Sequence, residues 1–464
     1  MTNQNYDFDA LCEQMHQWLE ERNTPEVRKQ LAEMNSFDIA TFLTDLREES
    51  EALMVLAFLM LSKEQGAEVF AELEAPEQEL IINSVSDKQL SNIIEEMYVD
   101  DAVDLMEELP ANVVKRVMRT ATPETRKLIN QYLKYPDNSA GSIMTAEFVD
   151  LKKYMSVRES IARIRRIGED KETIYVCYVT SADRKLEGVV TVKDLLLHDD
   201  DDEISGIMDT NVIFTHTTDD QEDVASLISD YDLLAVPVVD KEDRLVGIIT
   251  VDDVIDVINE ENTEDMERMA GILPSDTPYA RAPVLSIWKN RMPWLLFLML
   301  SATMTQMVMS HYETALAVQA VLTAYIPMLM GTGGNSGSQA STAVIRSLSL
   351  GETKPGDVMR VIWKEVRVAL LCGVTLAVVN FAKLLVVDHL MLHNAAVSIP
   401  VALTICCTLV FVVLFAKVVG CTLPLAAEKI GLDPAVMAAP LISTLTDTVS
   451  LLIYFQFARA ILQL

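Results

Sequence analysis

One carboxylate, Asp447, lies in a stretch, 434–458, that holds no other charged side chain. Counted along a continuous helix from Pro434, it lies about 20 Å up the axis, near the middle of a bilayer core. A carboxylate at that depth costs at least ~2.5 kcal/mol unless it faces water or a partner, which predicts a role in transport. The alternative is a structural Asp bonded to hydroxyls such as those of Ser443, Thr444 and Ser450.

Oxygen ligands accompany this acid. Pro440 lies seven residues earlier on the same helical face, and a proline inside a helix frees a carbonyl oxygen, here that of Val436. Asp433 and Pro434 open the stretch as N-cap and first helical residue, with Asp433 at the mouth of the path. Hard cations prefer carboxylate, carbonyl and water oxygens, so this face suits a cation path.

A second unusual segment, GTGGNSGSQAS at 331–341, follows Pro327. Its closely spaced glycines weaken a helix, so we expect the second membrane helix to end here. Irregular backbone inside a membrane is tolerated where protein or water satisfies it, which predicts a pore wall of carbonyl oxygens. Close helix–helix packing through small residues is the alternative.

These residues belong to the nearly neutral C-terminal part of the chain, which differs in charge from the strongly acidic N-terminal part. The 464 residues include 69 acidic and 37 basic ones, a net charge of −32. Residues 286–464 carry a net +3, from 11 basic and 8 acidic residues, and the rest of the chain carries −35. Such acidity excludes a usual nucleic-acid partner, because phosphates require basic surface.

Five apolar stretches predict five transmembrane helices, at 292–310, 314–338, 366–387, 397–417 and 434–458. Basic residues concentrate before the first span and between spans two and three and spans four and five. Positive-inside counting therefore puts the N-terminus in the cytoplasm and the C-terminus outside the inner membrane. Lys383 is expected to snorkel to the interface, and Asp388 to lie in a solvated outer loop.

The acidic part divides in two. Residues 30–135 show apolar residues at helical spacing, with related pieces about 35 residues apart that suit either stacked helix pairs or an ordinary bundle. A clearer repeat follows: Ile-Met, extended segment, helix, strand, charged turn, strand and a helix occur twice across 142–196 and 206–256. Alternating strand and helix signals predict an α/β unit made twice.

This repeat resembles a pair of CBS domains, through GVVTVKD at 188–194 and GIITVDD at 247–253. The resemblance implies that Thr191 with Asp194, and Thr250 with Asp253, contact an adenosine ribose, so an adenine nucleotide such as ATP is an expected ligand. The alternative is that each Thr and Asp caps the helix that follows.

The order of parts resembles the MgtE family of magnesium channels. The most specific strings are YIPMLMGTGGNSGSQAST (325–342), GLDPAVMAAPLISTLTDTVSLLIYF (431–455) and VGIITVDDVIDVINEENTEDMERMAG (246–271). The fold class expected is an all-α cytoplasmic N-terminal domain, an α/β CBS pair and an α-helical transmembrane domain. We expect the N-terminal domain over 1–135, the two CBS domains over 136–200 and 201–258, an acidic linker helix over 259–285 and the transmembrane domain over 286–464.

The resemblance implies a homodimer in the lipid bilayer with a pore along its two-fold axis. Asp447 of each subunit would bind hydrated Mg²⁺, helped by Asn335, with Asp433 at the cytoplasmic mouth. Ala439 stands before Pro440 where other members can carry a polar residue, which leaves the lining of the inner mouth open.

The resemblance also implies that Mg²⁺ bridges acidic faces of the cytoplasmic domains and closes the pore. Two carboxylates 5 Å apart repel by ~3 kcal/mol at an effective dielectric of 20, so close acidic faces separate unless divalent ions intervene. The matching positions are Asp101, Asp104, Asp220, Glu222, Asp232, Asp253, Asp256, Glu261, Glu264 and Asp265.

Two other functions fit parts of the chain. A CBS-regulated anion channel suits the repeat but not a lone membrane carboxylate. A membrane-anchored nucleotide sensor would bind ATP or AMP without ion flux. An enzyme is not expected, because no nucleophile–base pair, Walker loop or closed metal-ligand set is visible in the sequence.

Overall fold

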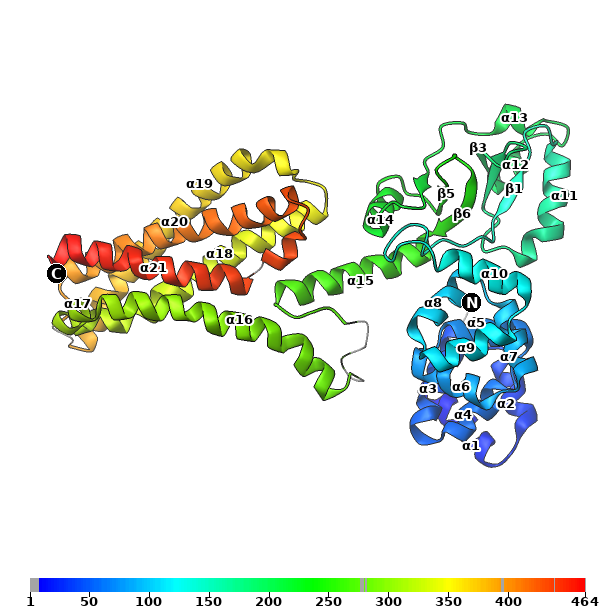
Figure 1. Ribbon diagram of the computed structural model, residues 1–464, viewed down its shortest axis with the longest axis horizontal. Helices are drawn as coiled ribbons and strands as arrows, with labels where there is room; N and C mark the ends of the chain where they lie inside the picture. The colour runs from blue at the N-terminus through cyan, green and yellow to red at the C-terminus, as the bar shows by residue number, and fades with distance from the viewer. Residues whose placement is uncertain (1–7, 276–278, 280–281, 394–395, 438, 464) are drawn as a thin grey trace. The chain divides into compact units, whose positions relative to one another are not determined.

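A computed structural model describes residues 8–463, apart from 276–278, 280–281, 394–395 and 438. The chain divides into two compact units, Met1–Ile258 and Asn259–Leu464 (Figure 1). The first holds a helical domain and an α/β domain, and the second holds the end of a linker helix and a helical bundle. These elements are those of the predicted fold class.

The N-terminal domain consists of short helices whose apolar residues form one core. Local capping sets several of their starts: Ser86, for example, exchanges bonds with Gln89 in a capping box. The helices are α1 Phe8–Glu20, α2 Thr24–Leu31, α3 Ser36–Glu49, α4 Glu51–Phe58, α5 Lys63–Ala71, α6 Ala75–Ser84, α7 Asp87–Glu96, α8 Val99–Glu108, α9 Ala111–Thr120 and α10 Pro123–Tyr132.

The predicted repeat forms two α/β units with the same topology. Each has a three-stranded sheet in which the first strand is parallel to the second and the second antiparallel to the third. The first unit contains β1 Val149–Leu151, α11 Val157–Ile167, a 3₁₀ turn Gly168–Asp170, β2 Val176–Thr180, β3 Leu186–Thr191 and α12 Val192–Leu197. The second contains α13 Ile204–Ile207, β4 Thr215–His216, α14 Gln221–Asp230, β5 Ala235–Val239, β6 Leu245–Thr250 and α15 Val251–Met269.

The repeated Gly and Ile-Met pairs join the two units reciprocally. A Cβ on Gly188 would lie 2.9 Å from the sulfur of Met208, and a Cβ on Gly247 would lie 2.8 Å from the sulfur of Met144. Each glycine therefore accepts the methionine of the other unit, which explains why both signals recur with the same spacing.

The linker helix differs from the predicted 259–285. It is the C-terminal half of α15, which begins at Val251 and ends at Met269. Gly271 follows with a φ of +72°, and the Ile272 amide donates to the Glu267 carbonyl, a left-handed C-terminal cap. The acidic helix therefore stops well before the membrane helices start.

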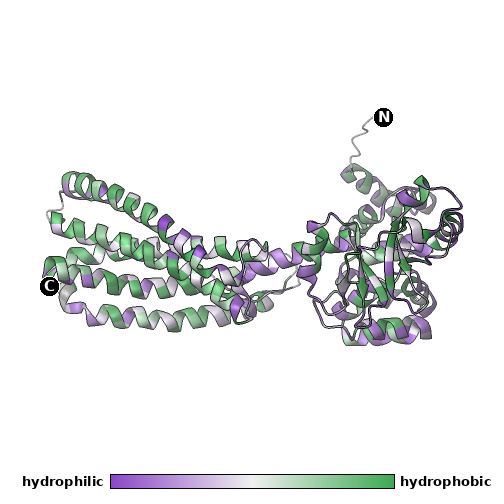
Figure 2. Ribbon diagram, turned by 90° about the horizontal axis from the view of Figure 1, so that it is seen from above, coloured by the Kyte–Doolittle hydropathy of each residue, from purple (hydrophilic) through white to green (hydrophobic). Residues whose placement is uncertain are grey.

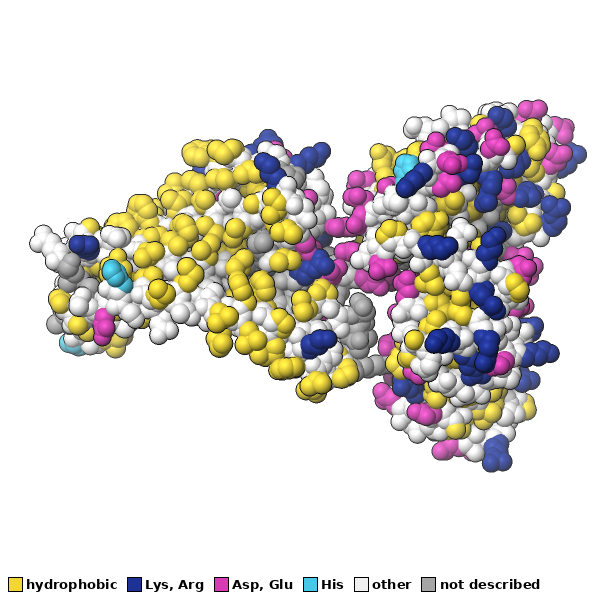
Figure 3. Space-filling view, viewed as in Figure 1, with side chains coloured by type: hydrophobic (Ala, Val, Ile, Leu, Met, Phe, Trp, Pro, Cys, Tyr) yellow, Lys and Arg dark blue, Asp and Glu magenta, His cyan; other side chains and the backbone are white. Residues whose placement is uncertain are grey.

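The second unit contains long apolar helices with charged residues mainly near their ends (Figures 2 and 3). They are α16 Val284–His311, α17 Glu313–Val318, α18 Ile326–Ser349, α19 Val358–Lys383, α20 Ile399–Lys429 and α21 Ala439–Leu462, with a π-helical extension Leu384–Met391 and 3₁₀ turns Ala320–Tyr325, Pro355–Asp357 and Pro434–Met437. Helix α18 packs against α20 and α21, and α20 packs against α19. The C-terminus lies beside α17, at the end of the bundle away from α15 (Figure 1).

Among the described residues, four helices are long and apolar enough to span a membrane: Val284–His311, Val358–Met391, Ile399–Lys429 and Pro440–Leu462. Helix α18 is not among them, although it runs within the same bundle. The predicted second span, 314–338, is also misplaced, since the long helix runs from Ile326 to Ser349. The total of five spans stays a prediction.

Asp388 does not lie in a solvated loop. The helix of the third span continues as a π-helix over Leu384–Met391, and this extension turns Asp388 into the bundle. Its Oδ2 accepts bonds from Lys383 Nζ at 2.7 Å and from the Tyr325 hydroxyl at 3.1 Å. Lys383 therefore has an ion-pair partner as well as access to the interface.

Candidate metal path and acidic clusters

The glycine segment is a regular part of α18, so the prediction that the helix ends there is wrong. A Cβ on Gly333 would lie 2.8 Å from Thr446 Cγ2, and one on Gly334 would lie 2.3 Å from Ser443 Oγ. Gly337 likewise meets Ile442. The glycines allow α18 and α21 to approach closely, which is the packing alternative. Helix packing thus outweighs the weak helix propensity of glycine.

The opposite face of α18 is polar and exposed. Gly331, Asn335, Gln339, Thr342 and Arg346 are all exposed and follow one another at three- or four-residue spacing. This stripe explains the low hydropathy of a helix that runs beside apolar neighbours. A polar face within the membrane requires water or another chain against it, because lipid cannot satisfy its hydrogen bonds.

Asp447 lies at a similar depth to Asn335. Gly333 contacts Thr446 while Gly337 contacts Ile442, so the two helices run antiparallel and their contacts fix the relative height. Since α21 begins at Ala439, Asp447 is about 12 Å along it, roughly 5 Å from the helix centre on the side of α15. Asp447 therefore lies closer to the middle of α21 than to either of its ends.

The described residues give the Asp447 carboxylate no hydrogen bond or ion pair, and its side chain is half-buried. The Thr444 hydroxyl donates instead to the Pro440 carbonyl at 3.0 Å, and the Ser450 hydroxyl is buried without a partner. The arrangement therefore does not support a structural Asp bonded to these hydroxyls.

The predicted opening of α21 is partly corrected. Asp433 does cap, since its Oδ1 accepts from the Ala435 amide at 2.7 Å, but the turn it caps is the 3₁₀ turn Pro434–Met437. Helix α21 starts only at Ala439, so Pro440 lies in its first turn and interrupts no helical bond to Val436. The predicted extra carbonyl ligand is therefore not supplied in this way.

The linker acids meet this end of the bundle. Arg268 pairs with Glu264 on its own helix and with Asp433. Asp265 Oδ2 accepts from the Ser349 hydroxyl at 3.3 Å. Burial, followed by the charges of Asp433 and then Glu261, raises the pKa of Asp265. The predicted residues Glu261, Glu264, Asp265 and Asp433 thus form one acidic cluster with Arg268 inside it.

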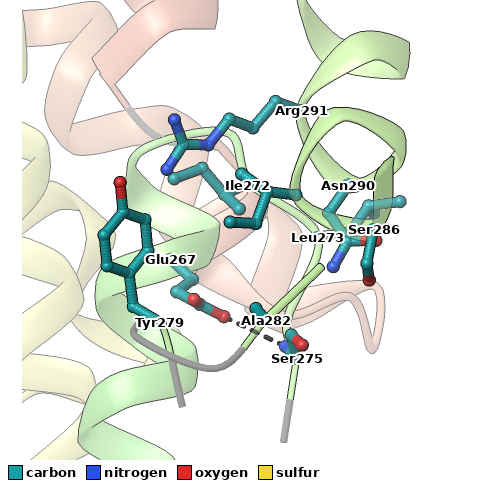
Figure 4. A pocket seen from close by; sticks show the side chains of 10 residues that line it. Glu267, Ile272, Leu273, Ser275, Tyr279, Ala282, Ser286, Asn290 and Arg291 are labelled. Carbon is teal, nitrogen blue, oxygen red and sulfur yellow. Dashed lines mark hydrogen bonds between the residues drawn. The ribbon is translucent and has the colours of Figure 1, made fainter. Parts of the chain in front are cut away.

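A shallow pocket separates the end of α15 from the start of α16 (Figure 4). Glu267 lies in it, and its Oε2 accepts from the Ser275 amide at 3.1 Å. Arg291 and Asn290 line the side formed by α16. No predicted site residue lines this pocket, so its polar groups serve the turn after the linker helix.

A second acidic cluster forms within the first unit. Burial, followed by the charge of Asp253, raises the pKa of Asp101 to about 6. Burial and the charges of Asp101 and Asp253 raise the pKa of Asp100 well above its ordinary range. Burial and the charges of Asp253 and Asp252 raise the pKa of Glu172 to about 7. Helix α8, the loop before β2 and the start of α15 therefore bring several acids close together.

Members of this cluster that are not among the predicted site residues include Asp100, Glu147 and Glu172. Glu147 Oε2 accepts from the Thr145 hydroxyl at 2.7 Å, and its charge adds to those that raise the pKa of Asp101 and Glu172. One Asp100 oxygen is buried without a hydrogen bond. Only the adjacency of Asp100 to Asp101 could have suggested its place, because the other two lie on distant loops.

The remaining predicted regulatory acids lie on the surface. Asp104, Glu222 and Asp256 are exposed. Burial, followed by the charges of Asp252 and Asp256, raises the pKa of Asp253. Asp220 caps α14 by accepting from the Glu222 amide at 2.9 Å. Asp232 has a φ of +52° just after α14. Among the described residues, no three His, Cys, Asp or Glu side chains are placed to hold one metal ion.

The Thr and Asp pairs of the two CBS units cap helices. Thr191 and Asp194 form a capping box at α12, with the Thr191 hydroxyl 2.5 Å from Asp194 Oδ2. The Thr250 hydroxyl donates to Asp253 Oδ2 at 2.6 Å at the start of α15. Capping thus accounts for these residues.

A CBS pair, an acidic linker and an apolar bundle that carries the Asp447 carboxylate are the parts of a membrane transporter for cations. The comparisons agree. Residues 326–457 match the MgtE family, described as divalent cation transporter, residues 34–138 match the MgtE intracellular N domain, and residues 140–201 and 204–260 match CBS domains. The chain belongs to the MgtE family of magnesium transporters.

Relatives of the same length support this assignment. The chain is 35% identical over 460 residues to the magnesium transporter MgtE of Thermus thermophilus, covering 98% of this chain and 99% of that one. It is 30% identical to the magnesium transporter MgtE of Bacillus subtilis, covering 98% of both. The similarity therefore extends through both units.

Two solved structures resemble the soluble part. One is the soluble part of a magnesium transporter, 33% identical, with a TM-score of 0.52, covering 55% of this chain and 99% of that one. The other is the cytosolic domain of the Mg²⁺ channel MgtE in complex with ATP, 34% identical, with a TM-score of 0.50, covering 53% and 99%.

Proposed function

We propose that this chain is a Mg²⁺-selective channel for magnesium uptake across the inner membrane, closed when cytosolic Mg²⁺ binds its acidic clusters. The observation that supports it most is the unpartnered Asp447 carboxylate on α21, at a depth similar to that of the exposed Asn335 on α18. Asp447 would hold hydrated Mg²⁺, with Asn335 bonding its water shell, because Mg²⁺ dehydrates reluctantly.

A homodimer supplies the missing wall of this path. Within the membrane the polar stripe of α18 cannot face lipid, and a second copy about a two-fold axis would oppose it with the same residues. Two Asp447 carboxylates would then share one hydrated ion. The charge of the basic loops supports the N-terminus in the cytoplasm and the C-terminus outside.

Gating by Mg²⁺ is supported by the charge of the acidic clusters. The charges of Asp101 and Asp253 both raise the pKa of Asp100 and that of Glu172, so these carboxylates repel one another. A divalent ion between Asp101 and Asp253 would therefore hold α8 and α15 together. Asp265 and Asp433 repel similarly at the inner mouth. Asp256, Glu261 and Glu264 would extend these two faces, and Asp104, Asp220, Glu222 and Asp232 would add exposed acids.

An adenine nucleotide is a second ligand that we propose for the CBS units. A similar cytosolic domain was crystallised with ATP. Thr191, Asp194 and Thr250 stand at the helix starts where a ribose hydroxyl would be bound, with the second carboxylate oxygens as acceptors. Calorimetric titration of the full-length protein with ATP tests this binding directly.

The pore assignment is tested by Asp447→Asn in proteoliposomes loaded with a Mg²⁺-sensitive dye. We expect Mg²⁺ influx to be lost, because the amide keeps the shape but removes the charge that holds the ion. Glu313→Gln, which neutralises an exposed acid on α17, is the matched control and should retain influx. Normal influx through the Asp447→Asn protein would refute the assignment.

Gating is tested in the same vesicles with Asp101→Asn/Asp253→Asn. Inhibition of influx by Mg²⁺ on the side of the soluble domains should require more Mg²⁺ than in the unaltered protein. The control is Asp200→Asn/Asp201→Asn, since these exposed acids pair only with Arg158 among the described residues. Unchanged inhibition would exclude the first-unit cluster from gating. ATP binding without any ion flux would favour a nucleotide sensor instead.

A further inference from the structure

Three residues on one face of α15 contact the ends of two bundle helices. Asn262 Oδ1 accepts from Arg346 Nη1 at 3.3 Å, Asp265 accepts from Ser349, and Arg268 pairs with Asp433. The three are spaced by three residues, so they lie along one stripe of the helix. The contacts reach α18 twice and the turn before α21 once. The linker helix therefore has a docking face made of protein groups alone.

Arg268 is the only cation of this docking face on the linker side. Between Arg244 and Arg281 the sequence contains no other Lys or Arg. Its guanidinium contacts two carboxylates, those of Glu264 and Asp433, from two separate segments of the chain. A guanidinium offers five donors in a planar fork and keeps its charge at every physiological pH, so it can bond to both acids at once.

We propose that Arg268 is a resident cation that holds the linker helix on Asp433 without a metal ion. This inference rests on the proposed gating, in which the same acids bind Mg²⁺. Arg268 already pairs with Glu264 and Asp433 and offsets one of their two negative charges, so docking here does not wait for Mg²⁺. The linker helix is then already partly docked at low Mg²⁺. Less Mg²⁺ is therefore needed at the other acids to complete closure. Arg268 is thus a positioning residue that sets the Mg²⁺ threshold.

The position of Asp433 makes this contact specific. Its Oδ1 holds the Ala435 amide while its Oδ2 receives Arg268, so both oxygens have defined partners. Loss of the guanidinium would release Oδ2 and leave three acids, Glu264, Asp265 and Asp433, near one another. Docking would then require a Mg²⁺ ion in place of the guanidinium, so closure should need one more bound Mg²⁺ and depend more steeply on its concentration.

The direct test is hydrogen–deuterium exchange of the amides of 262–269 in the full-length protein with EDTA. We expect Arg268→Gln to speed their exchange about tenfold, because a hydrogen bond between charged groups contributes enough to hold a docked helix. Asp433→Asn breaks the contact from the other side and should give the same result. Lys289→Gln, the same charge change on exposed α16, should leave exchange unchanged. Equal exchange in Arg268→Gln and the unaltered protein would overturn the proposal.

Flux measurements separate this inference from the gating on which it rests. In Arg268→Gln we expect half-inhibition of influx at a several-fold higher Mg²⁺ concentration and with a steeper dependence, while Arg268→Lys keeps part of the effect. If the unaltered protein is not inhibited by Mg²⁺ but exchange responds to Arg268→Gln, the gating proposal fails and Arg268 remains the metal-independent contact. A lower half-inhibition concentration in Arg268→Gln would overturn the assigned threshold role.

Discussion

Gly337 on α18 and Gly420 on α20 face each other at backbone contact: a Cβ on Gly420 would lie 2.2 Å from the Gly337 carbonyl oxygen. No side chain can be accommodated there without moving one helix. Helix α18 therefore packs closely against α20 at Gly337 and against α21 at Gly333 and Gly334. The position of Asn335 depends on this contact, because it sets the height and rotation of α18.

The first prediction concerns this contact. Gly420→Ala should destabilise the bundle by about 1–3 kcal/mol, the usual cost of inserting a group into a packed interface. The melting temperature of the full-length protein in detergent measures it. Gly331→Ala is the matched control, because a Cβ there meets no atom within 4 Å, and it should not lower the melting temperature. Equal melting temperatures for both variants would contradict the packing role.

Much of the fold could be predicted from periodic signals. The Gly188 and Gly247 repeat revealed two CBS units because each glycine serves the same contact in both. The prediction that the helix ends at the glycine segment of α18 is wrong. Glycine propensity alone predicts a break there, whereas packing against Ser443 stabilises the helix. Asp388 was assigned to a loop because the apolar run ends before it, whereas the π-helical extension has no sequence signature.

The site was predictable only where one residue carried the signal. Asp447 stands out because a membrane carboxylate is costly wherever it occurs. The first-unit cluster could be found only in part, since Glu147 and Glu172 join Asp101 through folding of loops far apart in the sequence. Arg268 carried no local signal either, because its partner Asp433 is 165 residues away.

The second prediction concerns the pH dependence of the first unit. Folding raises the pKa of Glu172 to about 7 and that of Asp101 to about 6, so the folded unit binds extra protons. Their contribution to stability is therefore fully present below about pH 4 and is lost as the pH rises through about 6 to 7. Without divalent ions, the thermal transition of this unit should fall over that range.

Glu172→Gln should flatten this pH dependence, because the amide cannot ionise. Mg²⁺ should stabilise the unit more at pH 7.5 than at pH 5.5, since it competes with protons for the same carboxylates. Calorimetry of the full-length protein at several pH values, with EDTA and with Mg²⁺, measures both effects. A transition that rises between pH 5 and 7 in EDTA would show that these acids are not buried together.

The third prediction concerns the pair of Lys383 and Asp388. Asp388→Asn should destabilise the bundle by about 1–3 kcal/mol, because it removes the charge of a buried carboxylate that accepts from Lys383 and Tyr325. Tyr325→Phe, which removes one hydrogen bond to the same carboxylate, should cost about 1 kcal/mol. The double variant Lys383→Gln/Asp388→Asn should cost less than the sum of its single variants. Additive costs in thermal unfolding would mean that the pair does not interact.

The last prediction compares two equivalent threonines, one of which also holds a cluster acid. Thr250→Val and Thr191→Val each remove a hydroxyl that bonds the Asp three residues on, so each should cost about 1 kcal/mol of stability. Asp253, held by Thr250, is also one of the acids proposed to bind Mg²⁺, whereas Asp194 lies outside that cluster. Thr250→Val alone should therefore raise the Mg²⁺ concentration for half-inhibition of influx, because Asp253 is no longer oriented. Equal shifts in both variants would attribute the effect to lost stability and remove Asp253 from the gating site.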